Sequence, residues 1–432
     1  MNGLIKKIFN RKLTPHALWN AASVAIRLIA SYFSNKIVVW YLGPAGTAIT
    51  EQARNFLDSI RGLVTLGINE GVINYSSVYS DRPKRLVNFL ASVYRLIMYS
   101  AFIIMFLMLI LAPQITDYLF QNPKYTFIIY IIAFFVPLYA YQIILLAVLN
   151  GLQQYRQISV FNALIHITGM ILTALLVINL KYTGALLGIT LTPVVVMGIL
   201  IFQVGKDKKF LLWEPFQYIT NNNHKNNFKR LFPYIIMAFV AAVIIPVGNI
   251  LIRNLIIDFY GPAGKIQAGY WDAIRKISSF AMMFISPLFG MFYLPQLANI
   301  KTGQQWRKLI SEMIKYIYLP FTFLLLTVFI FRHYFTLFIF SREYEPINQL
   351  YLWQFSGDIL KILALLIAYK MWTDRTVNLF VFSELSFWII YYIFSYYLID
   401  IKGVKGVIQA NIIAGFYYLI IMITAFRKTL FR

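Results

Sequence analysis

Residues 124–150 read KYTFIIYIIAFFVPLYAYQIILLAVLN, and the only charged side chain among them is that of Lys124. A helix that crosses the hydrocarbon of a bilayer needs roughly 20 consecutive, mostly apolar residues. This stretch is long enough, and it is apolar on every side of a helix rather than along one stripe. It therefore predicts a transmembrane helix.

The composition of the whole chain agrees with that prediction. Of its 432 residues, 60% are hydrophobic and 13% are charged, whereas soluble domains average about 45–50% and about 25%. Stretches of similar length and apolarity lie on both sides. They predict an all-α integral membrane fold with about twelve transmembrane helices, near residues 18–42, 48–79, 86–113, 124–150, 157–180, 183–204, 231–260, 264–298, 306–332, 346–372, 375–399 and 403–427.

Basic residues give a separate test of these spans, because the cytoplasmic loops of membrane proteins collect Lys and Arg. With the N-terminus inside, the inside segments hold 22 Lys and Arg and the outside loops hold 7. One missed span would invert the alternation along half of the chain. The distribution therefore predicts that both termini are cytoplasmic, and it explains the net charge of +23 without a nucleic-acid partner.

A polar stretch divides the predicted spans six and six. It predicts an N-terminal lobe over residues 1–204, a cytoplasmic linker over 205–230 and a C-terminal lobe over 231–432. Six helices per lobe give both lobes the same orientation, which indicates a parallel repeat about a pseudo-twofold axis along the membrane normal. A substrate site is then expected between the lobes.

The tetrapeptide GPAG marks this repeat. It begins at Gly43 and again at Gly261, each time between two long apolar stretches. The sequences Asp58-Ser-Ile-Arg61 and Asp272-Ala-Ile-Arg275 follow at similar distances. The alternative interpretation is that GPAG is a tight turn with no wider meaning.

Charged side chains inside the predicted spans carry the functional argument, because a charge at the bilayer centre costs at least about 2.5–3.5 kcal/mol and usually faces a protein interior or a watery cavity. Glu51, Arg54, Asp58 and Arg61 share one face of their helix through their 3-4-3 spacing. Neighbouring charges can also simply neutralise each other, and bases near a helix end can reach the headgroups. The ten bases are Arg27, Lys36, Arg54, Arg61, Arg95, Arg253, Arg275, Lys276, Lys315 and Lys361, and the seven acids are Glu51, Asp58, Glu70, Asp272, Glu312, Asp358 and Glu384.

The excess of bases favours an anionic substrate, and arginine binds phosphate oxygens in bidentate fashion. Arg95, Lys276 and Lys315 are expected near helix ends or interfaces and are left out of the site. The residues predicted to line the cavity and bind a diphosphate are Arg27, Lys36, Arg54, Arg61, Arg253 and Arg275, and those predicted as coupling or cavity charges are Asp58, Asp358, Lys361 and Glu384.

Other chemistries lack the residues that they need. The chain has no cysteine and four histidines that lie far apart, namely His16, His166, His224 and His333. No metal site or cofactor is therefore predicted. The nucleotide-binding pattern GxxxxGK[ST] is missing from the sequence, so ATP is not expected to drive transport directly.

With these motifs in place, the sequence resembles the Wzx-type O-antigen flippases of the multidrug/oligosaccharidyl-lipid/polysaccharide exporter superfamily, and within them the flippases for lipid III of the enterobacterial common antigen. The matching stretches are Gly43 to Gly46, Gly71 to Tyr75, Asp81 to Pro83, Gly184 to Gly188 with Pro193, Tyr293 to Pro295, Trp353-Gln354, Gly357-Asp358 with Lys361, and Glu384. Bases look shared with the family at Arg27, Lys36, Arg54, Arg253 and Lys361, and acids at Asp358 and Glu384. Glu51, Arg61 and Arg275 have no family counterpart.

The resemblance implies two six-helix lobes in a bacterial inner membrane, with alternating access to a central cavity. It implies a substrate of undecaprenyl diphosphate that bears an oligosaccharide, moved from the cytoplasmic to the outer leaflet without hydrolysis, and a polysaccharide polymerase and chain-length machinery as possible partners. A multidrug exporter of the same superfamily is the first alternative, although its cationic substrates would favour an acidic or apolar cavity. A membrane polymerase or ligase is the second, although every outer loop is shorter than about fifteen residues.

Overall fold

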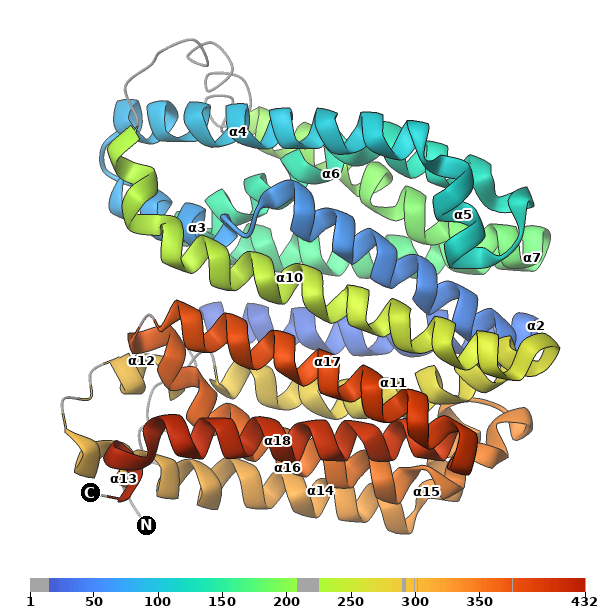
Figure 1. Cartoon of the computed structure of the whole chain (residues 1–432). Coiled ribbons are helices and arrows are strands. Elements are labelled where there is room, and N and C mark those ends of the chain that lie inside the picture. Colours follow the sequence, from blue (N-terminus) through green and yellow to red (C-terminus); the bar gives the residue numbers. More distant parts are fainter. Residues whose placement is uncertain are drawn as a thin grey trace. The chain divides into compact units, whose positions relative to one another are not determined.

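The computed structural model describes residues 15–207, 225–289, 293–298, 300, 302–374 and 376–431, and within them helices are the regular structure (Figure 1). The first half contains α2 (Pro15–Thr65), α3 (Asn69–Val78), α4 (Pro83–Ile110), α5 (Ala112–Phe120), η1 (Pro123–Tyr125), α6 (Thr126–Gly151) and α7 (Tyr155–Asp207). The second half contains α10 (Lys225–Tyr260), η2 (Gly261–Ala263), α11 (Gly264–Leu288), α12 (Leu294–Ala298), α13 (Gly303–Met313), η4 (Ile314–Tyr318), α14 (Leu319–Ile330), α15 (Arg332–Ile339), η5 (Arg342–Gln349), α16 (Tyr351–Asp374), α17 (Val377–Lys402) and α18 (Val404–Phe431).

The protein crosses the membrane many times. Nine helical segments of the described ranges are long and apolar enough to span a bilayer, and three of these, Ala22–Thr65, Arg156–Ile199 and Ile236–Met283, have 44, 44 and 48 residues. A helix of 44 residues is about 66 Å long, roughly twice the hydrocarbon thickness of about 30 Å. Counted as two crossings each, these three segments bring the total to the twelve spans that the sequence predicts.

Each double-length segment turns back through a residue with positive φ. Gly43 has φ 61° and ψ −160°, a conformation that is essentially restricted to glycine. Gly261 has φ 56°, and Lys181 has φ 53°. Gly43 and Gly261 are the first residues of the two GPAG motifs, and Pro44 and Pro262 directly follow them. Both motifs therefore lie at turns between helices, as predicted.

Two predicted spans each cover parts of two helices. The span predicted at 48–79 is divided, because Leu66 and Gly67 adopt positive φ after α2 and the chain restarts as α3. In the span predicted at 264–298, α11 (Gly264–Leu288) and α12 (Leu294–Ala298) lie on either side of residues 290–292, which are outside the described ranges. Most of the predicted linker, residues 208–224, lies outside the described residues, and the helices α7 and α10 occupy its two ends.

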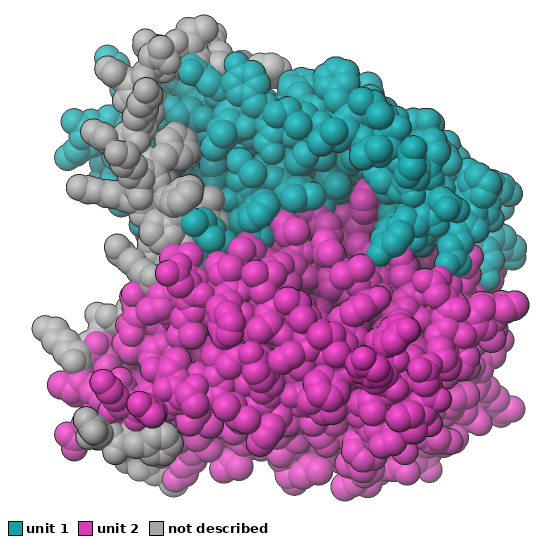
Figure 2. Space-filling model, in the orientation of Figure 1, with its two compact units in different colours: residues 1–37, 60–239 teal, residues 38–59, 240–432 magenta. Residues whose placement is uncertain are grey.

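The chain forms two compact units (Figure 2). Unit 1 comprises residues 1–37 and 60–239, and unit 2 comprises residues 38–59 and 240–432. In unit 1, α6 packs against α3, α4 and α7 and buries side chains such as Ile129 and Val136 completely. In unit 2, α18 packs against α16 and α17.

Residues 38–59 have an unusual position in this division. They are joined through the chain to unit 1 at both ends, yet they cluster with unit 2. A close backbone contact accompanies this placement: a Cβ atom at Gly269 of α11 would lie only 2.0 Å from the carbonyl oxygen of Pro44. Only glycine therefore permits α11 to approach the first GPAG turn this closely.

We expect Gly269→Ala to lower the thermal stability of the purified protein in detergent by about 1–3 kcal/mol, as overpacking of a well-packed interior does. Gly415→Ala is the matched control, because no heavy atom lies within 4 Å of a Cβ built there. Equal melting temperatures for the two variants would show that α11 does not approach the turn in the folded protein.

Candidate substrate-binding site

A buried ion pair lies at the centre of unit 2. Arg253 of α10 donates from Nε and Nη2 to the two carboxylate oxygens of Asp272 on α11, both at 2.7 Å. The side chains of Arg253 and Asp272 are 0% and 3% exposed. A buried charge is tolerated when its partner and its hydrogen bonds are complete, and the bidentate geometry meets that condition.

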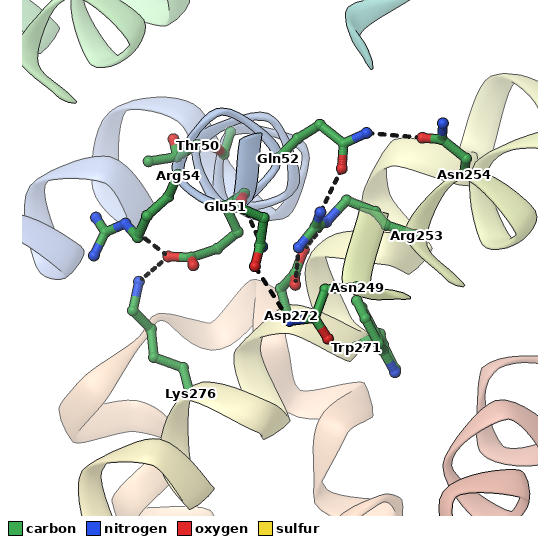
Figure 3. A network of polar contacts seen from close by, with 12 residues as sticks. Thr50, Glu51, Gln52, Arg54, Asn249, Arg253, Asn254, Trp271, Asp272 and Lys276 are labelled. Carbon is green, nitrogen blue, oxygen red and sulfur yellow. Dashed lines mark hydrogen bonds and ion pairs between the residues drawn. The ribbon is translucent and has the colours of Figure 1, made fainter. Parts of the chain in front are cut away.

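The same guanidinium reaches the helical segment that follows the first GPAG turn. Its Nη1 donates to Oε1 of Gln52, whose own amide donates to Oδ1 of Asn254 at 2.8 Å (Figure 3). Asn249 of α10 donates to Oδ1 of Asn55 at 3.2 Å. These hydrogen bonds fix residues 38–59 against α10.

A second ion pair lies beside the first. Lys276 of α11 donates to Oε1 of Glu51 at 2.8 Å, and Nε of Arg54 lies 3.8 Å from the same oxygen (Figure 3). The side chain of Arg54 is 47% exposed, whereas those of Lys276 and Glu51 are 14% and 18% exposed. Glu51 is therefore neutralised chiefly by Lys276, and Arg54 keeps nearly half of its side chain exposed.

Arg275 is held by an aromatic ring instead of a carboxylate. Its guanidinium carbon lies 4.3 Å from the ring centroid of Trp271. The guanidinium carbon of Arg253 lies 5.6 Å from the same centroid. Arg275 is half-buried, and a contact with a ring face does not itself use the N–H groups of a guanidinium. The stacking fixes the plane of the guanidinium without using its donors.

The remaining charges of unit 2 lie on α16 and α17. Asp358 is buried and accepts hydrogen bonds from Ser278 at 2.5 Å and from Gln354 at 3.1 Å. Glu384 accepts one from Tyr418 at 3.0 Å. Lys361 is exposed and is an electrostatic neighbour of both carboxylates.

The structure distributes the predicted site residues over both units. Arg54, Asp58, Arg253, Arg275, Asp358, Lys361 and Glu384 belong to unit 2, and Arg27, Lys36 and Arg61 belong to unit 1. Within unit 1, Arg27 is exposed and Lys36 and Arg61 are half-buried.

Two charges of α11 pair with partners that are distant in sequence. Asp272 lies one helical turn from Arg275 but pairs with Arg253 of another helix. Lys276, which was left out of the predicted site, lies in the middle of α11 and pairs with Glu51. In both cases a partner distant in sequence offers the shorter contact.

Sequence reasoning also missed uncharged members of this cluster. Gln52, Asn249 and Asn254 are buried amides in otherwise apolar spans. An amide in hydrocarbon needs a hydrogen-bond partner as a charge does, so these residues carry a signal that a search for charges alone overlooks. Trp271 and Tyr391 carry no such signal, because aromatic residues are common in every span.

A family of known proteins matches much of this chain. Residues 14–301 match the model of the family described as polysaccharide biosynthesis protein. The chain belongs to this family. Its relatives include the lipid III flippases of Escherichia coli (strain K12) and Shigella flexneri. Each is 24% identical to this chain over 405 residues, which cover 92% of this chain and 94% of the relative.

Solved structures of transporters share the fold. An inward-facing multidrug resistance MATE family transporter of the MOP superfamily aligns with a TM-score of 0.71 at 13% identity, over 94% of this chain and 98% of the other. The lipid II flippase MurJ in an inward closed conformation aligns with a TM-score of 0.68 at 15% identity, over 95% and 87%. The protein is therefore a multi-pass membrane protein with the fold of these transporters.

Breaking the ion pair between Arg253 and Asp272 should lower the free energy of unfolding. We expect Arg253→Met and Asp272→Leu each to cost about 3–5 kcal/mol of stability, because either change leaves a buried charge without its partner. The double variant should recover much of this loss, since it buries no charge. Thermal unfolding of the three variants in one detergent measures this, and additive losses in the double variant would contradict the pairing.

Proposed function

We propose that this protein is a flippase, which moves an oligosaccharide linked to undecaprenyl diphosphate from the cytoplasmic to the outer leaflet of a bacterial inner membrane. The observation that carries the proposal is the similarity to lipid III flippases over 92% of the chain. The fold of transporters, with relatives that are flippases rather than enzymes, supports a transport step without bond cleavage.

The charges of unit 2 support an anionic head group as the ligand. Arg253 and Lys276 are occupied by Asp272 and Glu51. Arg54 is 47% exposed and Arg275 stacks on Trp271, so they are the primary diphosphate ligands of this proposal. A diphosphate offers several acceptor oxygens, and each guanidinium can bind two of them.

The other predicted residues have supporting roles. Arg253 positions residues 38–59, and with them Arg54, through its hydrogen bond to Gln52. Arg27, Lys36 and Arg61 are further predicted diphosphate or cavity bases. Asp58, Asp358, Lys361 and Glu384 are proposed as coupling or cavity charges.

The topology belongs to the same proposal. Lobes over residues 1–204 and 231–432, joined by a cytoplasmic linker over 205–230, would alternate in exposing the head group to the two sides while the polyprenyl chain stays in lipid. Both termini would lie in the cytoplasm. A polymerase and the chain-length machinery would then receive the flipped substrate.

A multidrug exporter is the second candidate, and Asp358 and Glu384 are the observation in its favour, because carboxylates attract cationic drugs. Against it stands the lipid III flippase similarity, which extends over almost the whole chain. A membrane polymerase or ligase has no observation of this kind in its support.

We expect Arg54→Ala and Arg275→Ala each to slow the movement of an undecaprenyl diphosphate-linked sugar in proteoliposomes by roughly 10-fold or more. The reason is that a hydrogen bond to a charged group contributes about 1.5–3 kcal/mol and 1.4 kcal/mol corresponds to a factor of ten. Arg54→Lys should recover only part of the rate, since an ammonium cannot bind two oxygens in a plane.

Lys308→Ala is the control, because Lys308 is an exposed base on α13 outside the cluster. Normal transport by both arginine variants would refute the site. Transport of a cationic dye by the wild type, with no movement of the lipid diphosphate, would replace the proposed function with the second candidate.

A further inference from the structure

An aromatic cluster lies directly beside Arg275 in unit 2. The indole of Trp271, on which Arg275 stacks, donates to the hydroxyl of Tyr391 on α17 at 3.3 Å. The ring centroids of Phe387 and Trp388 lie 6.2 Å and 5.7 Å from that of Tyr391. The aromatic surface therefore continues from the stacked arginine along one side of α17.

The far end of this cluster carries a carboxylate. The rings of Phe387 and Tyr418 of α18 have centroids 6.0 Å apart, and the hydroxyl of Tyr418 donates to Glu384 at 3.0 Å. Lys361 interacts electrostatically with Glu384. Lys361 and Arg275 both interact electrostatically with Asp358. The aromatic cluster therefore has Arg275 at one end and Glu384 at the other.

The cluster keeps part of its surface exposed. Phe387, Trp388 and Glu384 are half-buried rather than buried, and a carboxylate within a span usually faces a protein interior or a watery cavity. The indole of Trp388 packs closely against α10, since a Cβ at Gly248 would lie 2.1 Å from it. Rigid aromatic faces next to hydrogen-bond acceptors are typical of sites for ligands with apolar faces and polar edges.

We propose that this side of α17 is a carbohydrate subsite. It would bind the sugar that is attached to the diphosphate, with Trp388 and Phe387 against the C–H face of the ring and Glu384 accepting hydrogen bonds from its hydroxyl groups. Tyr418 positions the carboxylate. Arg275 binds the adjacent phosphate, so one ligand covers both ends of the cluster.

This inference rests on the proposed function, and it adds which residues recognise the sugar as distinct from the diphosphate. It therefore predicts a division of labour. Variants of the aromatic cluster should affect only a lipid that bears a sugar, whereas variants of Arg275 should affect every lipid diphosphate.

The test compares two probes with the full-length protein in detergent: undecaprenyl diphosphate, and the same lipid bearing N-acetylglucosamine. Glu384→Gln and Trp388→Leu should weaken binding of the glycosylated lipid about 10-fold, the loss expected when a hydrogen bond to a charged group or a ring contact is removed. Binding of undecaprenyl diphosphate should stay within about twofold of the wild type. Arg275→Ala should weaken both probes to a similar extent.

Unchanged binding of the undecorated lipid also shows that each variant is folded. Matched controls are Glu312→Gln on α13 and Trp372→Leu on α16, because neither side chain belongs to the cluster and neither change should separate the probes. Tyr418→Phe, which removes only the hydroxyl that holds Glu384, should give an intermediate loss for the glycosylated lipid alone.

Equal losses for both probes in the Glu384 and Trp388 variants, or no loss for either, would overturn the subsite and leave the proposed function intact. A wild-type protein that binds neither probe would overturn the proposed function, and the subsite with it.

Discussion

The bidentate pair between Arg253 and Asp272 is the interaction on which the described arrangement of unit 2 depends. An arginine that is 0% exposed within a membrane-spanning helix is tolerable only with a complete set of partners. Asp272 supplies two of these and Gln52 the third. The pair therefore links α10, α11 and the segment 38–59, and this link places Arg54 and Lys276 around the shared carboxylate of Glu51.

Pairing also changes what the charges within the spans mean. An excess of bases in the sequence suggests a generally positive cavity. In unit 2, however, two of the bases are neutralised by short ion pairs, and the proposed diphosphate ligands are Arg54 and Arg275. A proposed site of two guanidinium groups would be more selective than a diffuse positive surface, because their planar donors suit phosphate oxygens.

The neighbourhood of Arg275 connects the electrostatics to recognition. Trp271 holds the guanidinium through its ring face and binds Tyr391 through its N–H, so one aromatic residue joins the proposed phosphate ligand to the proposed carbohydrate subsite. The proposed arrangement would meet the two demands of a lipid-linked sugar, whose head is charged at one end and a carbohydrate at the other.

The sequence by itself determined the all-helical membrane class, the twelve spans and the turns at Gly43 and Gly261. Apolar stretches, basic loops and glycine–proline pairs are local signals, and the bilayer requires every backbone group in a span to be bonded within its own helix. It also identified Arg54, Arg253, Arg275, Asp358 and Glu384 as functional candidates, because a charge in hydrocarbon needs an explanation.

Only the tertiary structure decided how those charges are used. Asp272 and Arg275 are one helical turn apart, yet Asp272 binds Arg253 from another helix, and Lys276 binds Glu51 from a third segment. The same holds for Gln52, Trp271 and Tyr391, whose roles come from the side chains opposite them. Spacing along a helix fixes which face a residue occupies. The energy of a buried charge, however, depends on its partners, and helix packing brings these partners together from distant parts of the chain.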